Sequence, residues 1–146
     1  MENKDVRWRQ RFENYKMALQ SLMQIADIMG GDDEVVIDAA IKRFEITFDL
    51  AWKVLQDYLF EQGYYEFKGP KKVISKSFQD SLIEDSEGWA MLHEDRNILS
   101  HKYDYDQSRI IFQRIISLHI PLFIQLKNKL SNEKKWRYSF AVIQLF

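Results

Sequence analysis

Apolar residues recur at alternating steps of three and four over long stretches of this chain, and this periodicity constrains the fold more than any other feature. The first stretch carries Phe12, Tyr15, Leu19, Leu22, Ala26 and Met29, and the second carries Ile37, Ile41, Phe44, Phe48, Ala51, Leu55 and Leu59. Steps of three and four return to the same face of an α-helix. Each stretch therefore predicts a long helix with one buried face.

Turn-forming residues are scarce, since the 146 residues include only 5 Gly and 2 Pro. Gly30-Gly31 and Gly63 are expected to end the first two helices, because glycine readily takes the left-handed conformation that follows a helix. Asp32 and Asp33 stand where an N-cap and a first-turn acid belong. A connection this short predicts that the two helices pack antiparallel.

Three further helices are expected in the second half of the chain. The third begins at Pro70, a residue suited to a first helical position, and buries Val73, Ile74, Phe78 and Leu82. The fourth runs from a cap at Asp85 or Ser86 to His101, and the fifth runs from about Asp106 to Leu130. The inner stripe of the fifth helix comprises Ile111, Ile115, Leu118, Leu122 and Leu126, and Pro121 is expected to kink or interrupt it.

These segments predict an all-α fold, an up-and-down antiparallel bundle of four to five helices in residues 1–130. Residues 131–146 form a C-terminal extension of uncertain structure. In this extension Trp136, Tyr138, Phe140 and Val142 alternate with other residues, a pattern that allows a strand as well as a helix.

Composition narrows the classes of function. The chain has no cysteine, hence no disulfide and no thiolate nucleophile, which suits a reducing cytoplasm. A net charge of −1 provides no overall attraction to nucleic acid. No apolar run is typical of a membrane span or signal peptide. We expect a cytoplasmic protein with no membrane association, metal or cofactor.

The candidate functional residues lie between Arg96 and Tyr103, in the sequence Arg-Asn-Ile-Leu-Ser-His-Lys-Tyr. On a helix, Arg96, Ser100 and Tyr103 share one face, and Asn97 and His101 form a neighbouring pair. An arginine fork binds phosphate, and a histidine exchanges a proton near neutral pH. Two interpretations stay open: a site that handles a phosphodiester without a metal, or a helix end whose arginine belongs to an internal ion pair.

A structural partner for Arg96 is available in the second helix, where Glu45 and Asp49 are spaced by four. The apolar seam of the fourth helix comprises Trp89, Leu92, Arg96, Leu99 and Tyr103. A buried charge without a partner is costly, so Glu45 or Asp49 is expected to pair with Arg96. Of the other histidines, His119 is expected to pack among apolar residues and His93 to lie on the surface.

Acidic residues surround the candidate segment. Between residues 80 and 106 the acids are Asp80, Glu84, Asp85, Glu87, Glu94, Asp95, Asp104 and Asp106, and the bases are Arg96 and Lys102. A single copy would repel nucleic acid unless the fifth helix or a second copy brought cations nearby.

Two stretches together carry a resemblance to a known family. They are Phe44-Glu45-x-x-Phe48-Asp49-Leu50-Ala51-Trp52-Lys53 and Glu94-Asp95-Arg96-Asn97-x-x-x-His101-x-Tyr103. In a chain of this length they resemble the nucleotidyltransferase substrate-binding protein family, a branch of the HEPN superfamily. The resemblance covers roughly residues 12–130 and does not include the C-terminal extension.

The resemblance implies a bundle that forms a homodimer and is encoded beside a minimal nucleotidyltransferase. One implied function is the toxin of a two-gene toxin–antitoxin pair. Such a toxin is a metal-independent endoribonuclease, which the nucleotidyltransferase silences by adenylylating the residue that corresponds to Tyr103. The alternative is a non-catalytic substrate-binding subunit of a two-component nucleotidyltransferase.

For the ribonuclease, the resemblance implies that Arg96 and His101 are catalytic. His101 is expected to act as general base or acid on RNA, and Arg96 to stabilise charge on the phosphate. Asn97 is expected to orient His101, and Ser100 to donate to the phosphate. One histidine does not easily serve as both base and acid, so a homodimer is expected to bring two such sets together.

Overall fold

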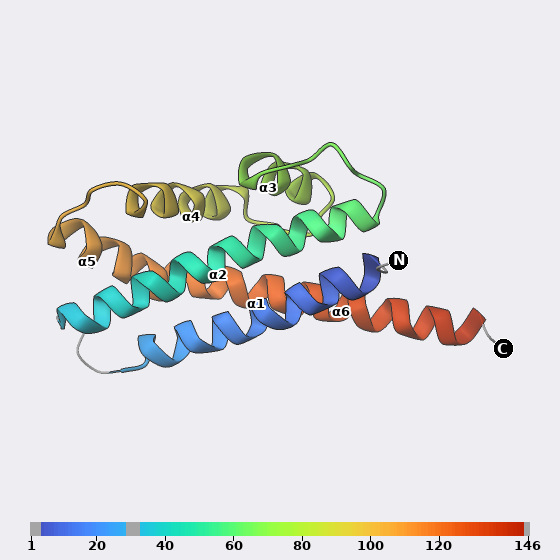
Figure 1. The fold of residues 1–146 in the computed structure, drawn as a ribbon, viewed down its shortest axis with the longest axis horizontal. Helices are drawn as coiled ribbons and strands as arrows, with labels where there is room; N and C mark the ends of the chain where they lie inside the picture. The colour runs from blue at the N-terminus through green and yellow to red at the C-terminus, as the bar shows by residue number, and fades with distance from the viewer. Residues whose placement is uncertain (1–3, 29–32, 145–146) are drawn as a thin grey trace.

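The computed structural model describes the backbone of residues 4–28 and 33–144, and the side chains of residues 7–28 and 33–133. In chain order its elements are α1 (Lys4–Ala26), α2 (Glu34–Glu61), α3 (Pro70–Gln79), α4 (Ser86–Leu99), α5 (Tyr105–Arg114), a π-helical segment (Ile115–His119) and α6 (Ile120–Gln144). These described residues contain no strand. The predicted all-α bundle is confirmed, with α5, the π segment and α6 forming one unbroken helix (Figure 1).

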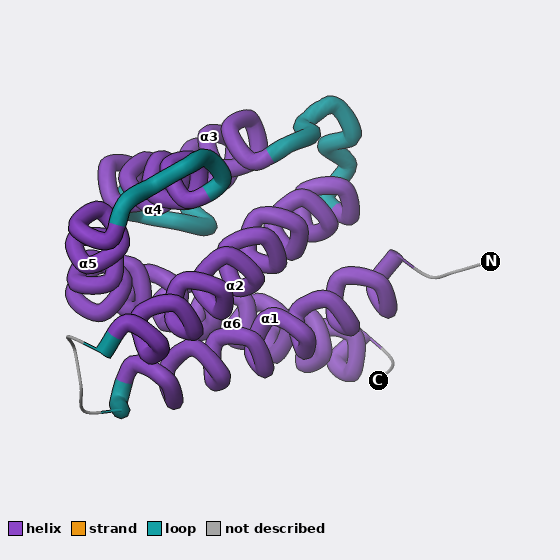
Figure 2. The backbone as a smooth tube through the Cα atoms, turned by 60° about the vertical axis from the view of Figure 1, so that its left-hand side comes forward, coloured by secondary structure: helices purple, strands orange, loops and turns teal. Residues whose placement is uncertain are grey.

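Helix α2 is central to the arrangement. It packs antiparallel to α1 on one side, while α3 and α4 lie along its other side (Figures 1 and 2). Asp33 caps α2 as predicted, because its carboxylate accepts a hydrogen bond from the Val35 amide at 2.9 Å. Gly63 follows the helix with a φ of 99°, a conformation that glycine adopts without strain. Helix α1 ends at Ala26, before the predicted stop, and Gly30, Gly31 and Asp32 lie outside the described residues.

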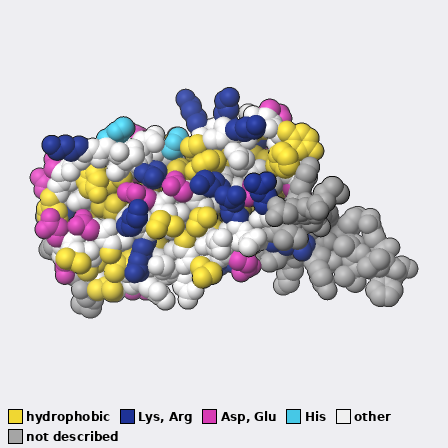
Figure 3. Space-filling view, viewed as in Figure 1, with side chains coloured by type: hydrophobic (Ala, Val, Ile, Leu, Met, Phe, Trp, Pro, Cys, Tyr) yellow, Lys and Arg dark blue, Asp and Glu magenta, His cyan; other side chains and the backbone are white. Residues whose placement is uncertain are grey.

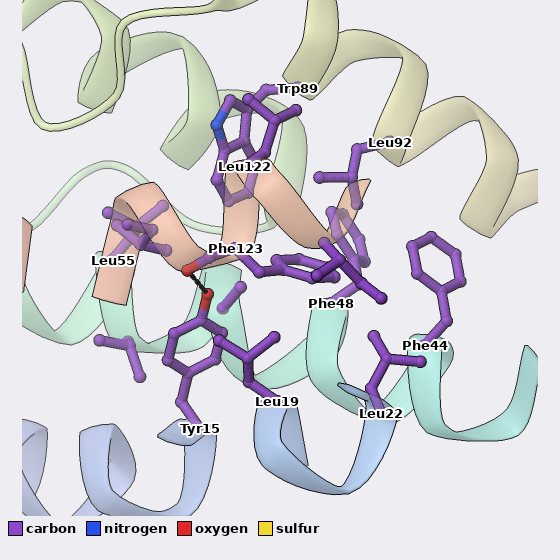
Figure 4. Packing of buried hydrophobic residues seen from close by; sticks show 14 of the residues in the cluster. Tyr15, Leu19, Leu22, Phe44, Phe48, Leu55, Trp89, Leu92, Leu122 and Phe123 are labelled. Carbon is purple, nitrogen blue, oxygen red and sulfur yellow. Dashed lines mark hydrogen bonds between the residues drawn. The ribbon is translucent and has the colours of Figure 1, made fainter. Parts of the chain in front are cut away.

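The core lies where α1, α2, α4 and α6 converge, and large aromatic side chains fill it (Figure 4). The Tyr15 hydroxyl donates to the backbone carbonyl of Phe123 at 2.7 Å, so a buried polar group is satisfied across the bundle. Burial raises the pKa of Tyr15 well above its ordinary value. Burial of each large apolar side chain of the core contributes about 1.5–3 kcal/mol to the free energy of folding. The core therefore holds the four helices in fixed positions.

Helix α3 begins at Pro70, and Val73, Ile74 and Leu82 are buried, as predicted. The predicted burial of Phe78 is wrong, because its side chain is 44% exposed. Val73 and Ser77 form the inward ridge of α3, whereas Phe78 follows the buried Ile74 on the neighbouring ridge and lies in the last turn of the helix. Phe78 therefore faces solvent beside α4.

The π-helical segment explains a second error in the predicted inner stripe. Leu118 is 45% exposed, whereas His119 is fully buried. A π turn contains an extra residue, so the inward position moves from residue 118 to residue 119. The segment ends two residues before Pro121, and α6 runs through this proline to Gln144, so the helix is not interrupted there.

The chain beyond residue 130 continues as α6 to Gln144, so the predicted boundary between residues 130 and 131 falls inside a helix. The residues of the predicted extension that the structure describes are helical, and their side chains beyond residue 133 lie outside the described ones.

By length and composition alone, the stretch Tyr105–Glu133 could cross a membrane, since it contains an 18-residue window with a mean hydropathy of 1.3. Its residues Ile111, Ile115 and Phe123 are buried in the bundle core, however, and the core helix of a globular protein passes the same test.

Candidate functional site

The end of α4 divides the candidate segment between a helix and a loop (Figure 2). Arg96 and Asn97 lie in the last turn of α4, and the Ser100 hydroxyl donates to the Asn97 carbonyl at 2.7 Å. The prediction of two helical ridges running to residue 103 is therefore wrong. Asp104 already caps α5, so His101 and Tyr103 are positioned by the connecting loop and not by helical spacing.

The structure brings Arg96 to both of its expected acidic partners. Its Nη1 lies 3.8 Å from Oε2 of Glu45, and its Nη2 lies 3.4 Å from Oδ2 of Asp49. Charge-assisted hydrogen bonds of this kind usually measure about 2.7–2.9 Å. The Nε atom of Arg96 is buried and, in the described structure, has no hydrogen-bond partner. Arg96 is thus held loosely, with unused donor capacity.

Tyr103 shares the acidic surroundings of Arg96. Its ring is half-buried and packs against the core. Burial, followed by the negative charges of Glu45 and Asp38, raises the pKa of its phenol. Glu45 therefore acts on Arg96 and on Tyr103, which links the helical and loop parts of the segment through α2.

His101, Asn97 and Ser100 are exposed at the end of α4. Within the described residues, no hydrogen bond or ion pair fixes the His101 ring. The structure of one copy therefore does not show Asn97 orienting His101. An imidazole in this position is accessible to a substrate or to a second copy of the chain.

The residue before Arg96 points inward and forms a network that the sequence analysis missed. Asp95 is 1% exposed and accepts two hydrogen bonds from Arg114, at 2.8 and 2.6 Å. His119 Nε2 lies 2.6 Å from the same carboxylate. An ionised carboxylate only accepts hydrogen bonds, so Nε2 carries the proton in this contact.

His119 occupies the packed position that the sequence analysis expected. It is fully buried and stacks on Phe44, with 5.3 Å between ring centroids. Burial raises the pKa of Asp95, but the hydrogen bonds and charges of His119 and Arg114 outweigh it, and the pKa is lowered. The hydrogen bond with Asp95 also raises the pKa of Arg114.

A sequence signal for this network existed. Leu92, Asp95 and Leu99 follow steps of three and four, so the seam of α4 passes through Asp95 and not through Arg96. His119 could not be assigned by spacing, because the π segment that turns it inward changes the register.

His93 is a further correction, because it is half-buried and not on the open surface. Its ring stacks on Phe48 with a centroid distance of 5.6 Å and an interplanar angle of 18°. Burial, and then the charge of Lys71, lowers its pKa. His93 lines a cavity of about 500 Å³ between α3 and α4, which extends to Asn97.

Metal-binding geometry does not occur in the part of the chain whose side chains are described. There, no group of three or more His, Asp or Glu side chains is arranged to hold a metal ion.

The fold and this segment define a class of protein: an all-helical bundle in which an Arg-x4-His sequence spans the end of one helix and the following loop. Residues 10–132 match the family model described as "nucleotidyltransferase substrate binding protein like". The chain belongs to this family, as its sequence motifs indicated.

A curated relative supports the assignment. The chain is 27% identical over 109 residues to a Haemophilus influenzae protein named "Probable ribonuclease HepT", covering 66% of this chain and 73% of that protein.

Two solved structures share the fold. A crystal structure of a Thermus thermophilus protein is 31% identical, with a TM-score of 0.67 over 82% of this chain and 97% of that one. A Haemophilus influenzae protein, described as having the fold of a substrate-binding domain of a nucleotidyltransferase, is 24% identical. Its TM-score is 0.62 over 88% of this chain and 99% of that one, and at this identity the likeness concerns the fold.

Proposed function

We propose that this chain is the toxin of a two-gene toxin–antitoxin pair in the cytoplasm, a metal-independent endoribonuclease that acts as a homodimer. One observation carries the proposal. In a member of this family, Arg96 lies at the end of α4, partly exposed and in long contacts with its acidic partners, and an accessible His101 follows in the loop. A relative that bears the name of a ribonuclease supports the same activity.

The proposed reaction is attack of a ribose 2′-oxygen on the adjacent phosphorus. His101 takes the 2′-hydroxyl proton as general base, the bond from phosphorus to the 5′-oxygen breaks, and that oxygen takes a proton from His101 of the second copy. The products are a 2′,3′-cyclic phosphate and a 5′-hydroxyl. Arg96 stabilises the extra negative charge that develops on the phosphate oxygens, and Ser100 donates to the same group after its hydroxyl proton leaves the Asn97 carbonyl. Asn97, four residues before His101 in the chain, orients it once the dimer forms.

The proposed switch is Tyr103. A partner nucleotidyltransferase transfers the adenylyl group of ATP to the phenol oxygen and releases pyrophosphate. Because Tyr103 and Arg96 both lie beside Glu45, the new phosphate competes with RNA for the Arg96 guanidinium.

The ribonuclease is tested with the purified protein, single-stranded RNA and excess EDTA. We expect cleavage with cyclic-phosphate ends, and a loss of about 100-fold or more in His101→Ala, the usual contribution of a general base. Lys102→Arg, which changes the exposed side chain next to His101 but keeps its charge, is the matched control and retains cleavage. RNA left intact by the wild-type dimer, or cut equally by His101→Ala, would contradict the proposal.

The switch is tested by intact-mass measurement after incubation with the partner and ATP. We expect the wild-type chain to gain one adenylyl group and Tyr103→Phe to gain none. Tyr105→Phe is the matched control, because Tyr105 is a more exposed tyrosine two residues away. A mass gain in Tyr103→Phe would place the modification elsewhere.

A second candidate function is a non-catalytic substrate-binding subunit of a two-component nucleotidyltransferase. The observation that favours it is the pairing of Arg96 with two carboxylates, which offsets its charge in the isolated chain. This function requires that the pair of proteins, and not this chain alone, modifies a small molecule. It also requires that His101→Ala leaves the activity of the pair unchanged.

A further inference from the structure

The cavity between α3 and α4 is separate from the Arg96 ion pairs but meets the candidate site at Asn97. Its volume is about 500 Å³, and its lining includes Ile74, Phe78 and Trp89 as apolar walls. Small-molecule sites usually measure about 300–1,000 Å³ and combine apolar walls with a few polar groups. In size and composition the cavity therefore fits a small organic group.

The aromatic groups of the cavity suit a flat ring. Trp89 is 2% exposed and forms a rigid part of the wall, whereas Phe78 is 44% exposed and open to a ligand. The His93 ring is held by its stack on Phe48. Aromatic side chains of this kind stack nucleobases, and each stacked base contributes about 1–3 kcal/mol.

The polar groups of the cavity suit a base edge and an anion. Burial and Lys71 lower the pKa of His93, so its ring is neutral at physiological pH and both donates and accepts hydrogen bonds. Lys71 is exposed at the rim, and basic side chains project over α3 beside apolar ones (Figure 3). Among the described residues of this lining, Lys71 on α3 is the cation, and Glu94 on α4 is the one acidic side chain.

The position of the cavity relative to the candidate site follows from the order of the residues on α4. Asn97 lies one helical turn after His93 on α4, and both line the cavity. Arg96 immediately precedes Asn97 on the same helix, and the loop that carries His101 follows the end of α4. A group bound between Phe78 and His93 therefore lies beside the place where the scissile phosphate is proposed to bind.

We propose that the α3–α4 cavity binds one nucleoside monophosphate unit, with the base among Phe78, Trp89 and His93 and the phosphate on Lys71. The binding itself needs no cleavage. Its role as the subsite for the nucleotide next to the scissile bond rests on the proposed ribonuclease function. A free nucleotide and a nucleotide of an RNA strand present the same chemistry to these groups.

The test is binding of two probes, AMP and a 2′-O-methyl RNA octamer that lacks the attacking hydroxyl, measured by calorimetry on the full-length protein. Lys71→Ala is expected to weaken both about tenfold, the loss for one charge-assisted hydrogen bond. Phe78→Ala is expected to weaken both by a similar factor through loss of stacking. Both side chains are exposed, so the fold should survive either change. Lys72→Ala is the matched control, because Lys72 is an exposed lysine on α3 that does not line the cavity.

The outcomes separate the two proposals. Weaker binding of both probes in Lys71→Ala and Phe78→Ala, but not in Lys72→Ala, supports the site even if no RNA is cleaved. Binding of AMP without the octamer supports a nucleotide site and overturns its role as an RNA subsite. Equal losses in Lys71→Ala and Lys72→Ala, or no binding of either probe, overturn the site, even if RNA is cleaved.

Discussion

Two consecutive residues of α4 enter two very different electrostatic environments. Asp95 is buried, and its contacts with Arg114 and His119 measure 2.6–2.8 Å. Arg96 is partly exposed, and its contacts with Glu45 and Asp49 measure 3.4 and 3.8 Å. The Asp95 network joins α4 to the helix that begins at Tyr105, whereas the Arg96 pairs join α4 to α2.

The difference separates a structural ion network from an exchangeable one. A buried carboxylate with short hydrogen bonds does not exchange its partners for a ligand, because breaking these bonds would leave a buried charge with neither a partner nor water around it. A partly exposed arginine in long contacts loses little interaction free energy when a phosphate replaces its carboxylate partner. The two environments lie one residue apart, so the rigid network fixes the helix end from which Arg96 and the His101 loop extend.

The largest expected effect is on stability and concerns the buried network. Asp95→Asn leaves Arg114 and His119 without a charge partner and should lower the free energy of unfolding by about 3–5 kcal/mol, the usual cost of breaking a buried pair. Urea unfolding measures this loss. Glu87→Gln, an exposed acid in the first turn of the same helix, is the control and should change stability by less than about 1 kcal/mol. Equal losses in both variants would show that the Asp95 contacts do not stabilise the fold.

The same network should make stability depend on pH in a defined direction. The pKa of Asp95 is lower in the folded chain than its unfolded value of about 3.9, so its contribution is fully present above that pH. The contribution is lost as pH falls through the folded pKa, where the carboxylate takes up a proton. Unfolding experiments on the wild type and Asp95→Asn should therefore show a stability difference that shrinks below about pH 4. A difference that grows toward acid would contradict the assignment.

The smallest expected effect on stability is at Arg96. Because its pairs are long and partly exposed, Arg96→Ala should change the free energy of unfolding by only about 0–1 kcal/mol. RNA cleavage should nevertheless fall steeply in the same preparation. Arg114→Ala provides the contrast, since it removes a partner of the buried Asp95 and should lower the free energy of unfolding more than Arg96→Ala does. A large loss of stability in Arg96→Ala would place Arg96 with the structural network.

The bundle could be predicted from the sequence because its helices follow one regular period from Phe12 to Leu99. The pairing of Arg96 with α2 was also accessible, since Glu45 and Asp49 are one turn apart. The exposure of Leu118 and the contact of His119 with Asp95 were not, because a π turn is a departure from the period that no local residue signals. Nor was the placement of His101 and Tyr103, because the end of α4 changes their relation to Arg96 from helical spacing to loop geometry.

The central claim is that Arg96 exchanges its carboxylate partners for an RNA phosphate. The direct measurement is the affinity of labelled 2′-O-methyl RNA for the wild type, Arg96→Ala, the double variant Glu45→Gln with Asp49→Asn, and the triple variant that combines all three changes. We expect the double variant to bind up to about fivefold more tightly and Arg96→Ala to bind more weakly. The gain should vanish in the triple variant. A triple variant that keeps the whole gain would show that the carboxylates act by general repulsion, and it would contradict the exchange.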